Sequence, residues 1–428
     1  MGSFHFIGIK GSGMSALAQV LFDLNHEVQG EDMEAVLFTQ QALEARNIPL
    51  YPFGEAPLSP DMTVIVSNAF DEQHPSVLKC RQLGLEVQRY HRFLGELIQG
   101  YTSIAVTGAH GKTTTTGMLV HAFQTDNPPC SLIGDGTGKG EPRATQFIFE
   151  SCEYKRHFLA YRPNIAVVTN IDFDHPDYFK DIDDVRHAFE EMAALTSGSL
   201  VACGDDPQVR LLQTGTNTLF YGFNENNKLR ASNITVERNA TFFDVHYGDL
   251  QIERFSIPSF GKHNVLNALA VIGVALLLDR DLAAVRSQLA TFSGVKRRFS
   301  EKPWGSNIII DDYAHHPSEI KATLEAARSK YPERQIVAVF QPHTYSRLEK
   351  LIDDFADSLT GADEVYLCPI FGSAREAAGS VSIHDLEARI PNAHLVTDTF
   401  AADMSAYSDA ILIFMGAGDI QKYQEQLI

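Results

Sequence analysis

The sequence predicts an α/β protein built from three domains, at residues 1–98, 99–295 and 296–428. Its 428 residues are too many for one hydrophobic core. Strand patterns alternate with helix patterns along the chain, which favours parallel sheets. Glycine-rich turns follow a strand in the first two blocks, as in nucleotide-binding folds. We expect Rossmann-like domains at both ends and, between them, a P-loop ATPase-like parallel sheet with a small antiparallel insertion.

The first domain opens with a strand pattern at residues 5–9, a glycine-rich turn and a helix pattern from residue 14 to 24. The turn contains Gly11-x-Gly13-x-x-Ala16, a relaxed dinucleotide fingerprint, and Asp32 follows where a carboxylate could contact a ribose. Three interpretations stay open: a nicotinamide dinucleotide, a nucleoside diphosphate, or a tight turn without a ligand. A second nucleotide loop in the same chain favours the nucleoside diphosphate.

The central domain carries the most informative segment, Ala105-Val-Thr-Gly-Ala-His-Gly-Lys-Thr-Thr-Thr-Thr116. A short apolar strand leads into the turn and a helix-compatible run follows it. Backbone N–H groups and a helix N-terminus would therefore surround an anion. Lys112 can reach the outer phosphates of ATP or GTP, and the Thr113 hydroxyl can bind Mg²⁺. The usual P-loop has a longer spacing between its glycines, so an incidental glycine-rich turn is the alternative.

Polar side chains follow two further strand patterns of the central domain, at residues 146–149 and 165–169. Glu150 follows the first strand and His175 follows the second. Ligands of open parallel sheets bind beyond the carboxyl ends of the strands, so Glu150, His175 and Thr113 could meet around Mg²⁺ and a γ-phosphate. The alternative for His175 is an ordinary turn residue in an Asp-His-Pro segment.

A small antiparallel meander is expected at residues 233–257, and a helix from residue 265 to 278 follows it. Asn264 and Asn267 lie at the start of this helix. They could cap the helix, or they could contact a base or a ribose.

In the third domain, polar segments follow two strand patterns, at residues 311–317 and 341–347. We expect these segments to form one face of a site, because both lie at the carboxyl end of a strand. The basic segment at residues 296–298 is either a solvated hinge or a phosphate clamp between domains. The strand patterns of this domain span residues 308–311, 336–340, 365–367 and 411–415, with a helix pattern at 317–331.

The net charge of −19 argues against binding to nucleic acid or to an anionic membrane surface. The longest apolar run is too short to cross a bilayer. The five cysteines are scattered, with no C-x-x-C pair, which predicts free thiols rather than a zinc site. The start of the chain lacks the basic segment of a secretory signal. We therefore expect a cytoplasmic protein with neither nucleic-acid nor membrane partners.

Several of these segments occur together in the order and spacing of the Mur ligase family, which the chain resembles over nearly its whole length. They are Thr107-Gly-Ala-His-Gly-Lys-Thr113, Thr169-Asn-Ile-Asp-Phe-Asp-His175, Gly261-Lys-His-Asn-Val-Leu-Asn-Ala268, Arg297-Arg-Phe299 and Asp312-Tyr-Ala-His-His-Pro317. Three further segments are similar to the branch of the family that adds L-alanine to UDP-N-acetylmuramate: Gly8-Ile-Lys-Gly-Ser-Gly-Met-Ser15, Phe371-Gly-Ser-Ala-Arg-Glu376 and Phe414-Met-Gly-Ala-Gly-Asp419.

The resemblance implies an ATP-dependent, Mg²⁺-requiring amide ligase of peptidoglycan precursor synthesis that works through an acyl phosphate. The first domain would bind UDP-N-acetylmuramate, the central domain ATP and the third domain L-alanine. We expect a monomer or a weak homodimer. One alternative is the family member that recycles a muramyl tripeptide. Alternatives from other classes are a nucleotide-switched binding protein and a nicotinamide dehydrogenase.

The resemblance also implies roles for individual residues, carried over by position. ATP would be bound by Gly108, Ala109, His110, Gly111, Lys112, Thr113 and Thr114, with Asn264 and Asn267 near the adenine. Mg²⁺ would be held by Thr113, Glu150 and His175. The reaction centre would contain Lys112, Glu150, His175, Arg298, His315 and Arg347. The sugar nucleotide would contact Gly11, Ser12, Gly13, Met14, Ser15, Asp32, Ser67 and Asn68. Cys152 stands where the family commonly has an aspartate.

Overall fold

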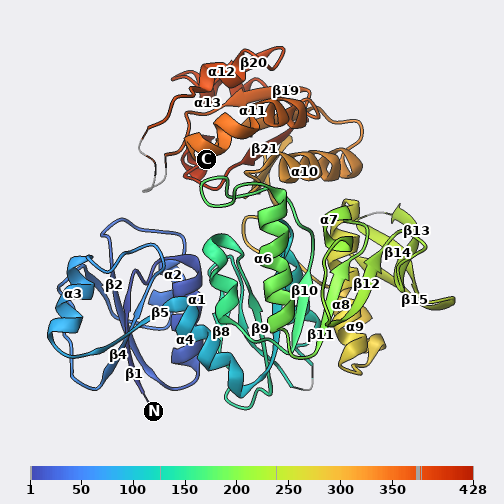
Figure 1. The fold of residues 1–428 in the computed structure, drawn as a ribbon. Helices are drawn as coiled ribbons and strands as arrows, with labels where there is room; N and C mark the ends of the chain where they lie inside the picture. Colours follow the sequence, from blue (N-terminus) through green and yellow to red (C-terminus); the bar gives the residue numbers. More distant parts are fainter. Residues whose placement is uncertain (1, 126, 238, 373–375, 377, 428) are drawn as a thin grey trace.

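The computed structural model describes residues 2–125, 127–237, 239–372, 376 and 378–427. These residues form three β-sheets with flanking helices, one sheet in each expected domain (Figure 1). The predicted α/β class with three domains is confirmed. The segment at residues 371–376, which contributed to the resemblance, lies partly outside the described residues.

The first sheet has five parallel strands in the order β3-β2-β1-β4-β5, as predicted for a Rossmann-like unit. Its strands are β1 (Ser3–Ile7), β2 (Glu27–Asp32), β3 (Leu50–Pro52), β4 (Met62–Val66) and β5 (Glu86–Arg89). Its helices are α1 (Ser12–Asp23), α2 (Gln40–Glu44), α3 (Pro75–Gln82) and α4 (Tyr90–Leu97), and the 3-10 turn η1 (Ile98–Gly100) leads to the next domain.

The central sheet has ten strands in the order β15-β14-β13-β12-β11-β10-β6-β9-β7-β8. The expected antiparallel segment is present, but β13 pairs in parallel with β12, so it extends the central sheet. The strands are β6 (Thr102–Thr107), β7 (Cys130–Leu132), β8 (Gly138–Lys139), β9 (Gln146–Glu150), β10 (Ile165–Val168), β11 (Ser199–Cys203), β12 (Asn217–Gly222), β13 (Leu229–Glu237), β14 (Ala240–Tyr247) and β15 (Leu250–Ile257). The helices are α5 (Lys112–Ala122), η2 (Tyr154–Ala160), α6 (Ile182–Leu195), α7 (Pro207–Arg210), α8 (Lys262–Leu277) and α9 (Leu282–Leu289).

The third sheet has six strands in the order β16-β17-β21-β18-β19-β20, and only its edge strand β16 is antiparallel to its neighbour. The strands are β16 (Ser300–Trp304), β17 (Asn307–Asp312), β18 (Ile336–Phe340), β19 (Glu364–Leu367), β20 (Ala393–Leu395) and β21 (Ile411–Met415). The helices are α10 (Pro317–Lys330), α11 (Tyr345–Leu359), α12 (Ile383–Glu387), α13 (Phe400–Ser405), α14 (Gln421–Gln424) and η3 (Glu425–Leu427).

The first two domains share one hydrophobic core. A single buried cluster includes Leu17 of α1 and Leu94 of α4 together with Phe147 and Phe149 of β9. Helix α1 also packs closely on β8, where a Cβ at Gly138 would lie 1.9 Å from the Ala16 carbonyl oxygen. Because this interface is apolar and close-packed, the two domains have little freedom to move apart.

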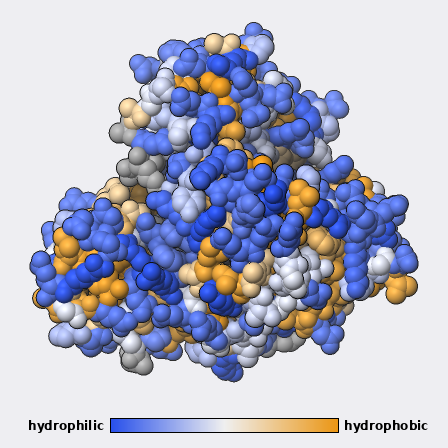
Figure 2. All heavy atoms as spheres, in the orientation of Figure 1, coloured by the Kyte–Doolittle hydropathy of each residue, from blue (hydrophilic) through white to orange (hydrophobic). Residues whose placement is uncertain are grey.

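The third domain has its own hydrophobic clusters, and its contacts with the central domain are mainly polar. In Figure 1 it lies above the central domain, with α10 at the edge next to that domain. Polar interdomain interfaces are the ones that most often open and close. No helix among the described residues is long and apolar enough to cross a membrane, and Figure 2 shows a mainly hydrophilic face with smaller apolar areas.

Candidate active site

The phosphate loop connects β6 to α5 and has the backbone geometry of an anion site. Gly108 and Gly111 both have positive φ, +134° and +80°. A Cβ at Gly108 would lie 2.0 Å from Thr169 Oγ1, so only glycine fits there. Helix α5 begins at Lys112, so its free N–H groups point into the loop. The loop therefore has the strand–turn–helix context that the sequence predicted.

Lys112 lies folded over this loop. Its Nζ donates to the carbonyl oxygens of Gly108 (2.5 Å) and Ala109 (2.9 Å) and contacts Glu153 Oε2 at 3.2 Å. Burial by itself lowers the pKa of Lys112, but the surrounding carboxylates, Glu153 first, outweigh it and raise that pKa. Lys112 is thus a permanent cation at the point where phosphates would bind.

Two carboxylates stand beside the phosphate loop. Thr113 Oγ1 donates to Glu150 Oε2 at 2.7 Å. Glu153 lies next to His175, whose Nε2 is 3.7 Å from Glu153 Oε1, and that buried oxygen has no hydrogen-bond partner within the described part of the chain. The carboxylates that contact His175 are Glu153 and Asp174, whereas Glu150, which we expected beside His175, contacts Thr113.

These groups fit a divalent cation. Ligand atoms of Cys152, Glu153 and His175 lie within 4.8 Å of one another. Carboxylate and hydroxyl oxygens are the donors that Mg²⁺ prefers, and an imidazole is a less usual one. Burial lowers the pKa of His175, although Asp174 and Glu153 act in the opposite direction, so the ring is available as a neutral ligand. Glu153 adds a carboxylate that the sequence analysis did not place in the site.

A cavity of about 1200 Å³ opens beside the loop, between the central and third domains. Gly111, Thr114, Asn264 and Asn267 are among its lining residues. Asn267 Oδ1 accepts from Thr115 Oγ1 at 3.1 Å, and Asn264 Nδ2 donates to the Phe260 carbonyl at 2.7 Å. The two asparagines are thus fixed at the N-terminal end of α8 and border a space large enough for a nucleotide.

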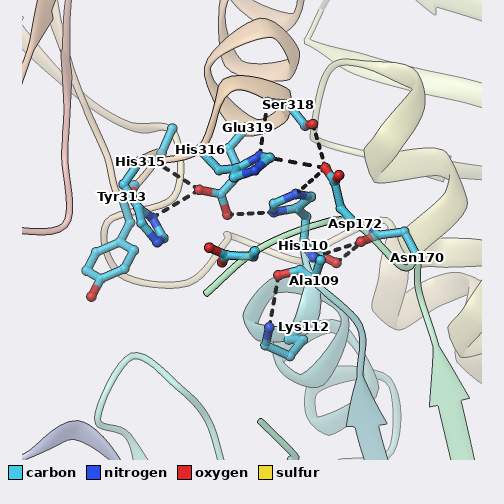
Figure 3. A network of polar contacts seen from close by, with 12 residues as sticks. Ala109, His110, Lys112, Asn170, Asp172, Tyr313, His315, His316, Ser318 and Glu319 are labelled. Carbon is cyan, nitrogen blue, oxygen red and sulfur yellow. Dashed lines mark hydrogen bonds and ion pairs between the residues drawn. The ribbon is translucent and has the colours of Figure 1, made fainter. Parts of the chain in front are cut away.

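His110 connects the phosphate loop to the third domain (Figure 3). Its Nε2 contacts Asp172 Oδ2 at 3.0 Å, and its Nδ1 lies 3.4 Å from Glu319 Oε1. The same Asp172 oxygen accepts from Ser318 Oγ at 2.7 Å. Burial alone lowers the pKa of His110, but its hydrogen bonds to Asp172 and Glu319 outweigh burial and raise the pKa to about 9. A charged imidazole therefore bridges two carboxylates on different domains.

Glu319 contacts basic side chains from several segments. It contacts His315 Nδ1 at 3.0 Å and Arg298 Nη1 at 3.5 Å in addition to His110. Burial raises the pKa of this carboxyl group, but His315 and His110 outweigh burial and hold it well below its usual range. Arg298 and His315, both predicted from the sequence, are brought together by this one carboxylate at the start of α10.

Arg347 reaches across the same interface from α11. Its Nη2 donates to Asp174 Oδ1 at 2.7 Å, and Arg347 is only 5% exposed. Burial raises the pKa of Asp174, but His175 and Arg347 outweigh it and keep the carboxyl group ionised. In this arrangement the Arg347 guanidinium is paired with Asp174, the residue next to His175, so the third domain contacts the border of the candidate cation site.

We expect the stability of the protein to fall as pH rises from about 6.5 to 9, because His110 then loses its proton. A pKa raised above its unfolded value of 6.5 stabilises the fold fully below that pH and ceases to do so above the folded pKa of about 9. The contribution has an upper bound of roughly 3 kcal/mol. The melting temperature of His110→Gln, measured by thermal unfolding, should change less across this pH range than that of the unchanged protein.

His187→Gln is the matched control, because the His187 side chain on α6 is 62% exposed. Its pH profile should follow that of the unchanged protein. If His110→Gln also follows the unchanged protein, the loss at alkaline pH has another origin.

The first-domain residues lie at the carboxyl ends of β1, β2 and β4, which are adjacent strands. Asp32 Oδ2 accepts from the Lys10 N–H at 2.7 Å and Oδ1 from the Met33 N–H at 2.8 Å, so it braces the glycine turn. Asn68 Oδ1 contacts His91 Nδ1 at 2.7 Å. The residues predicted to contact the sugar nucleotide lie in the glycine turn, at the start of α1 and along this strand edge. They are Gly11, Ser12, Gly13, Met14, Ser15, Asp32, Ser67 and Asn68.

The structure therefore gathers the predicted residues in two places: a first-domain strand edge, and the junction of the central and third domains. Sequence reasoning missed four acidic partners at the junction: Glu153, Asp172, Asp174 and Glu319. Two signals could have found some of them. Asp172 and Asp174 lie in the polar segment that ends at His175, and Glu153 is three residues after Glu150.

Three family models match the chain. The Mur ligase family catalytic domain matches residues 3–102, the Mur ligase middle domain 106–275, and the Mur ligase glutamate ligase domain 297–420.

Among solved structures, the UDP-N-acetylmuramate-alanine ligase of Thermotoga maritima is 26% identical with a TM-score of 0.83, covering 100% of this chain and 98% of that one. The murein peptide ligase of Psychrobacter arcticus is 24% identical with a TM-score of 0.74, covering 100% and 98%. The MurF ligase of Thermotoga maritima, solved with ADP, is 18% identical with a TM-score of 0.64, covering 93% of each chain. The last two show likeness of fold alone.

Proposed function

This chain belongs to the Mur ligase family, and from that premise we propose that it is an ATP-dependent ligase that joins L-alanine to the carboxylate of UDP-N-acetylmuramate. The observation that carries the proposal is the convergence of Lys112, the Thr113–Glu150 pair and the Glu153–His175 pair at the phosphate loop. The likeness to the UDP-N-acetylmuramate-alanine ligase of Thermotoga maritima supports this choice of substrates.

In the first step, an oxygen of the muramyl carboxylate attacks the γ-phosphorus of ATP in line. The bond from that phosphorus to the β,γ-bridging oxygen breaks, ADP leaves, and an acyl phosphate forms. Lys112 would move from the carbonyls of Gly108 and Ala109 to the phosphate oxygens, where charge develops. When bound, Mg²⁺ neutralises part of the phosphate charge. The residues that would hold it are Thr113, Glu150, Glu153 and His175.

In the second step, the neutral amine of L-alanine attacks the acyl carbon, the C–O bond to the phosphoryl group breaks, and phosphate leaves. The amine must give up a proton to a base. His315 is our candidate, because its Nδ1 lies 3.0 Å from Glu319 and from the Tyr313 carbonyl oxygen. These contacts fix the ring and leave Nε2 for proton transfer. Arg298 and Arg347 would supply positive charge for the amino-acid carboxylate from the same interface.

Water has to be excluded, because an acyl phosphate hydrolyses. The polar contacts of Asp172 and Asp174 with the third domain would hold that domain over the junction when the substrates are bound. The adenine would occupy the cavity beside Asn264 and Asn267, and the UDP group would occupy the strand edge of the first domain. We place this reaction in the cytoplasm and expect a monomer or a weak homodimer.

A panel of amino acids tests the substrate assignment. With MgATP and UDP-N-acetylmuramate, we expect phosphate release to be fastest with L-alanine and to stop when either the sugar nucleotide or the amino acid is omitted. A coupled assay for phosphate measures this directly, and mass spectrometry identifies the product. Turnover that requires a muramyl tripeptide instead would favour the recycling ligase.

Two other outcomes would contradict an amide ligase altogether. Continued ATP hydrolysis without an acceptor would favour a nucleotide-switched binding protein. Binding of NADH at the first-domain glycine turn, in place of the UDP-sugar, would favour a dehydrogenase.

A further inference from the structure

A second cavity, of about 350 Å³, lies between α4 of the first domain and η2 of the central domain. Five of its lining residues are basic side chains: His91, Arg92, Lys155, Arg156 and His157. Glu96 is the acidic residue among those that line it. This concentration of basic groups contrasts with the net charge of −19 of the whole chain.

The cavity is built into a rigid seam. A Cβ at Gly95 of α4 would lie 2.5 Å from the Ala160 carbonyl oxygen, so the two elements pack in backbone contact beside the cavity. The rings of His91 and His157 stack across the seam with centroids 4.7 Å apart. The opposite walls are therefore held together by packing.

The backbone of one wall is strained where its basic side chains begin. Lys155 and Arg156 have φ values of +52° and +56°, which non-glycine residues rarely adopt. Two consecutive residues in the left-handed region raise the free energy of the folded state, and such backbone strain is typical of functional sites. Arg156 is further fixed by Asp184, whose Oδ1 accepts from Nη2 at 2.7 Å, while Nη1 is buried and has no hydrogen-bond partner among the described residues.

The positive charge of the cavity is only partly neutralised. Within the part of the chain that the structure describes, no salt bridge is found for Arg92 or Lys155. Burial, with added repulsion from Arg92 and Arg89, lowers the pKa of His91 to about 4. The positive charges of Arg92 and Arg89, which repel a proton on His91, would attract an anion at the same place.

We propose that this cavity is a second anion site, which binds the diphosphate group of a small molecule. Guanidinium and ammonium groups are the side chains that proteins use for phosphate oxygens. The cavity exceeds the size of a single phosphate and falls in the range of small-molecule sites. The anion would lie between Arg92 on one wall and Lys155 and Arg156 on the other.

Both walls continue into the sites described above. On one wall, His91 contacts Asn68, and its neighbour Tyr90 lies behind Gly13, where an added Cβ would come within 2.9 Å of the Tyr90 hydroxyl. On the other wall, the Tyr154 ring lies tilted against the His175 ring, with centroids 4.5 Å apart, and Tyr154 directly precedes Lys155. The diphosphate could thus belong to the sugar nucleotide or to a separate ligand, and both sources share the same chemistry.

The test uses inorganic diphosphate without Mg²⁺, measured by calorimetry on Lys112→Ala, in which the phosphate loop is impaired. We expect binding to persist in Lys112→Ala and to weaken at least about tenfold when Arg92→Glu and Lys155→Glu are added. The matched control adds Arg143→Glu and Lys302→Glu, which change the net charge equally at exposed positions outside the residues that line the cavity. If UDP-N-acetylmuramate competes with diphosphate, the sugar nucleotide is the source of the bound group. If it does not compete, the cavity binds a separate ligand.

A second readout follows His91 itself. In protein with ¹³C-labelled histidine, bound diphosphate should raise the pKa of His91 from its present value of about 4, because an anion stabilises the imidazolium. The proposal is overturned if diphosphate binds with a Kd weaker than about 10 mM. It is equally overturned if the control pair weakens binding as much as the cavity pair, or if His91 does not respond.

Discussion

Replacing Lys112 by alanine is expected to lower the rate of L-alanine-dependent ADP release by about 100-fold or more. The ammonium group is buried among carboxylates at the mouth of the phosphate loop, and it stays charged there. Charge develops on the γ-phosphate oxygens in the transition state, so loss of this cation acts on turnover more than on nucleotide binding. Steady-state kinetics with saturating MgATP measure the effect.

Lys180→Ala is the control, because Lys180 lies in the same domain and is exposed. It should leave the rate unchanged. Thermal unfolding of Lys112→Ala must show a folded protein, since removing a partner of buried Glu153 also costs stability. A folded Lys112→Ala variant with normal turnover would exclude Lys112 from phosphoryl transfer.

The exchange of Glu153 for glutamine is expected to have a comparable effect, about 100-fold on turnover, and to raise the Mg²⁺ concentration needed for half-maximal rate about tenfold. Glu153 is 2% exposed and contacts both Lys112 and His175, and its Oε1 has no hydrogen-bond partner among the described residues. An amide keeps the shape of the side chain but removes its charge. A titration of the rate with Mg²⁺ at fixed ATP separates the two effects.

Glu191→Gln on α6 is the matched control, since this residue is exposed and belongs to the same domain. It should keep both the rate and the Mg²⁺ requirement. If Glu153→Gln lowered turnover without any change in Mg²⁺ requirement, Glu153 would act by holding Lys112 and His175 in position. Unchanged values for both would remove Glu153 from the reaction centre.

The phosphate loop could be predicted because its function lies in local structure. The apolar strand, the glycines with positive φ and the helix that starts at Lys112 are neighbours in sequence, and each has a characteristic residue pattern. The same holds for β10 and β17, whose apolar runs end in polar segments. Edge strands such as β3, β8 and β20 were not predicted, because runs of two or three residues give too little periodicity.

The antiparallel segment shows which features the sequence predicts and which depend on the tertiary structure. Alternating residues and turns predicted the strands β13, β14 and β15. Their attachment to the central sheet depends on two residue pairs between β12 and β13, Tyr221–Leu229 and Gly222–Arg230. No pattern within either strand specifies that partner.

By itself, the sequence determined the α/β class, the two glycine turns, and the side chains at the carboxyl ends of the strands. These follow from periodicity, glycine conformation and the fixed direction of parallel strands, which act over a few residues. Only the tertiary structure decided which charges meet. The contacts of His110 with Glu319 and of Arg347 with Asp174 join different domains, so they exist only once those domains have docked.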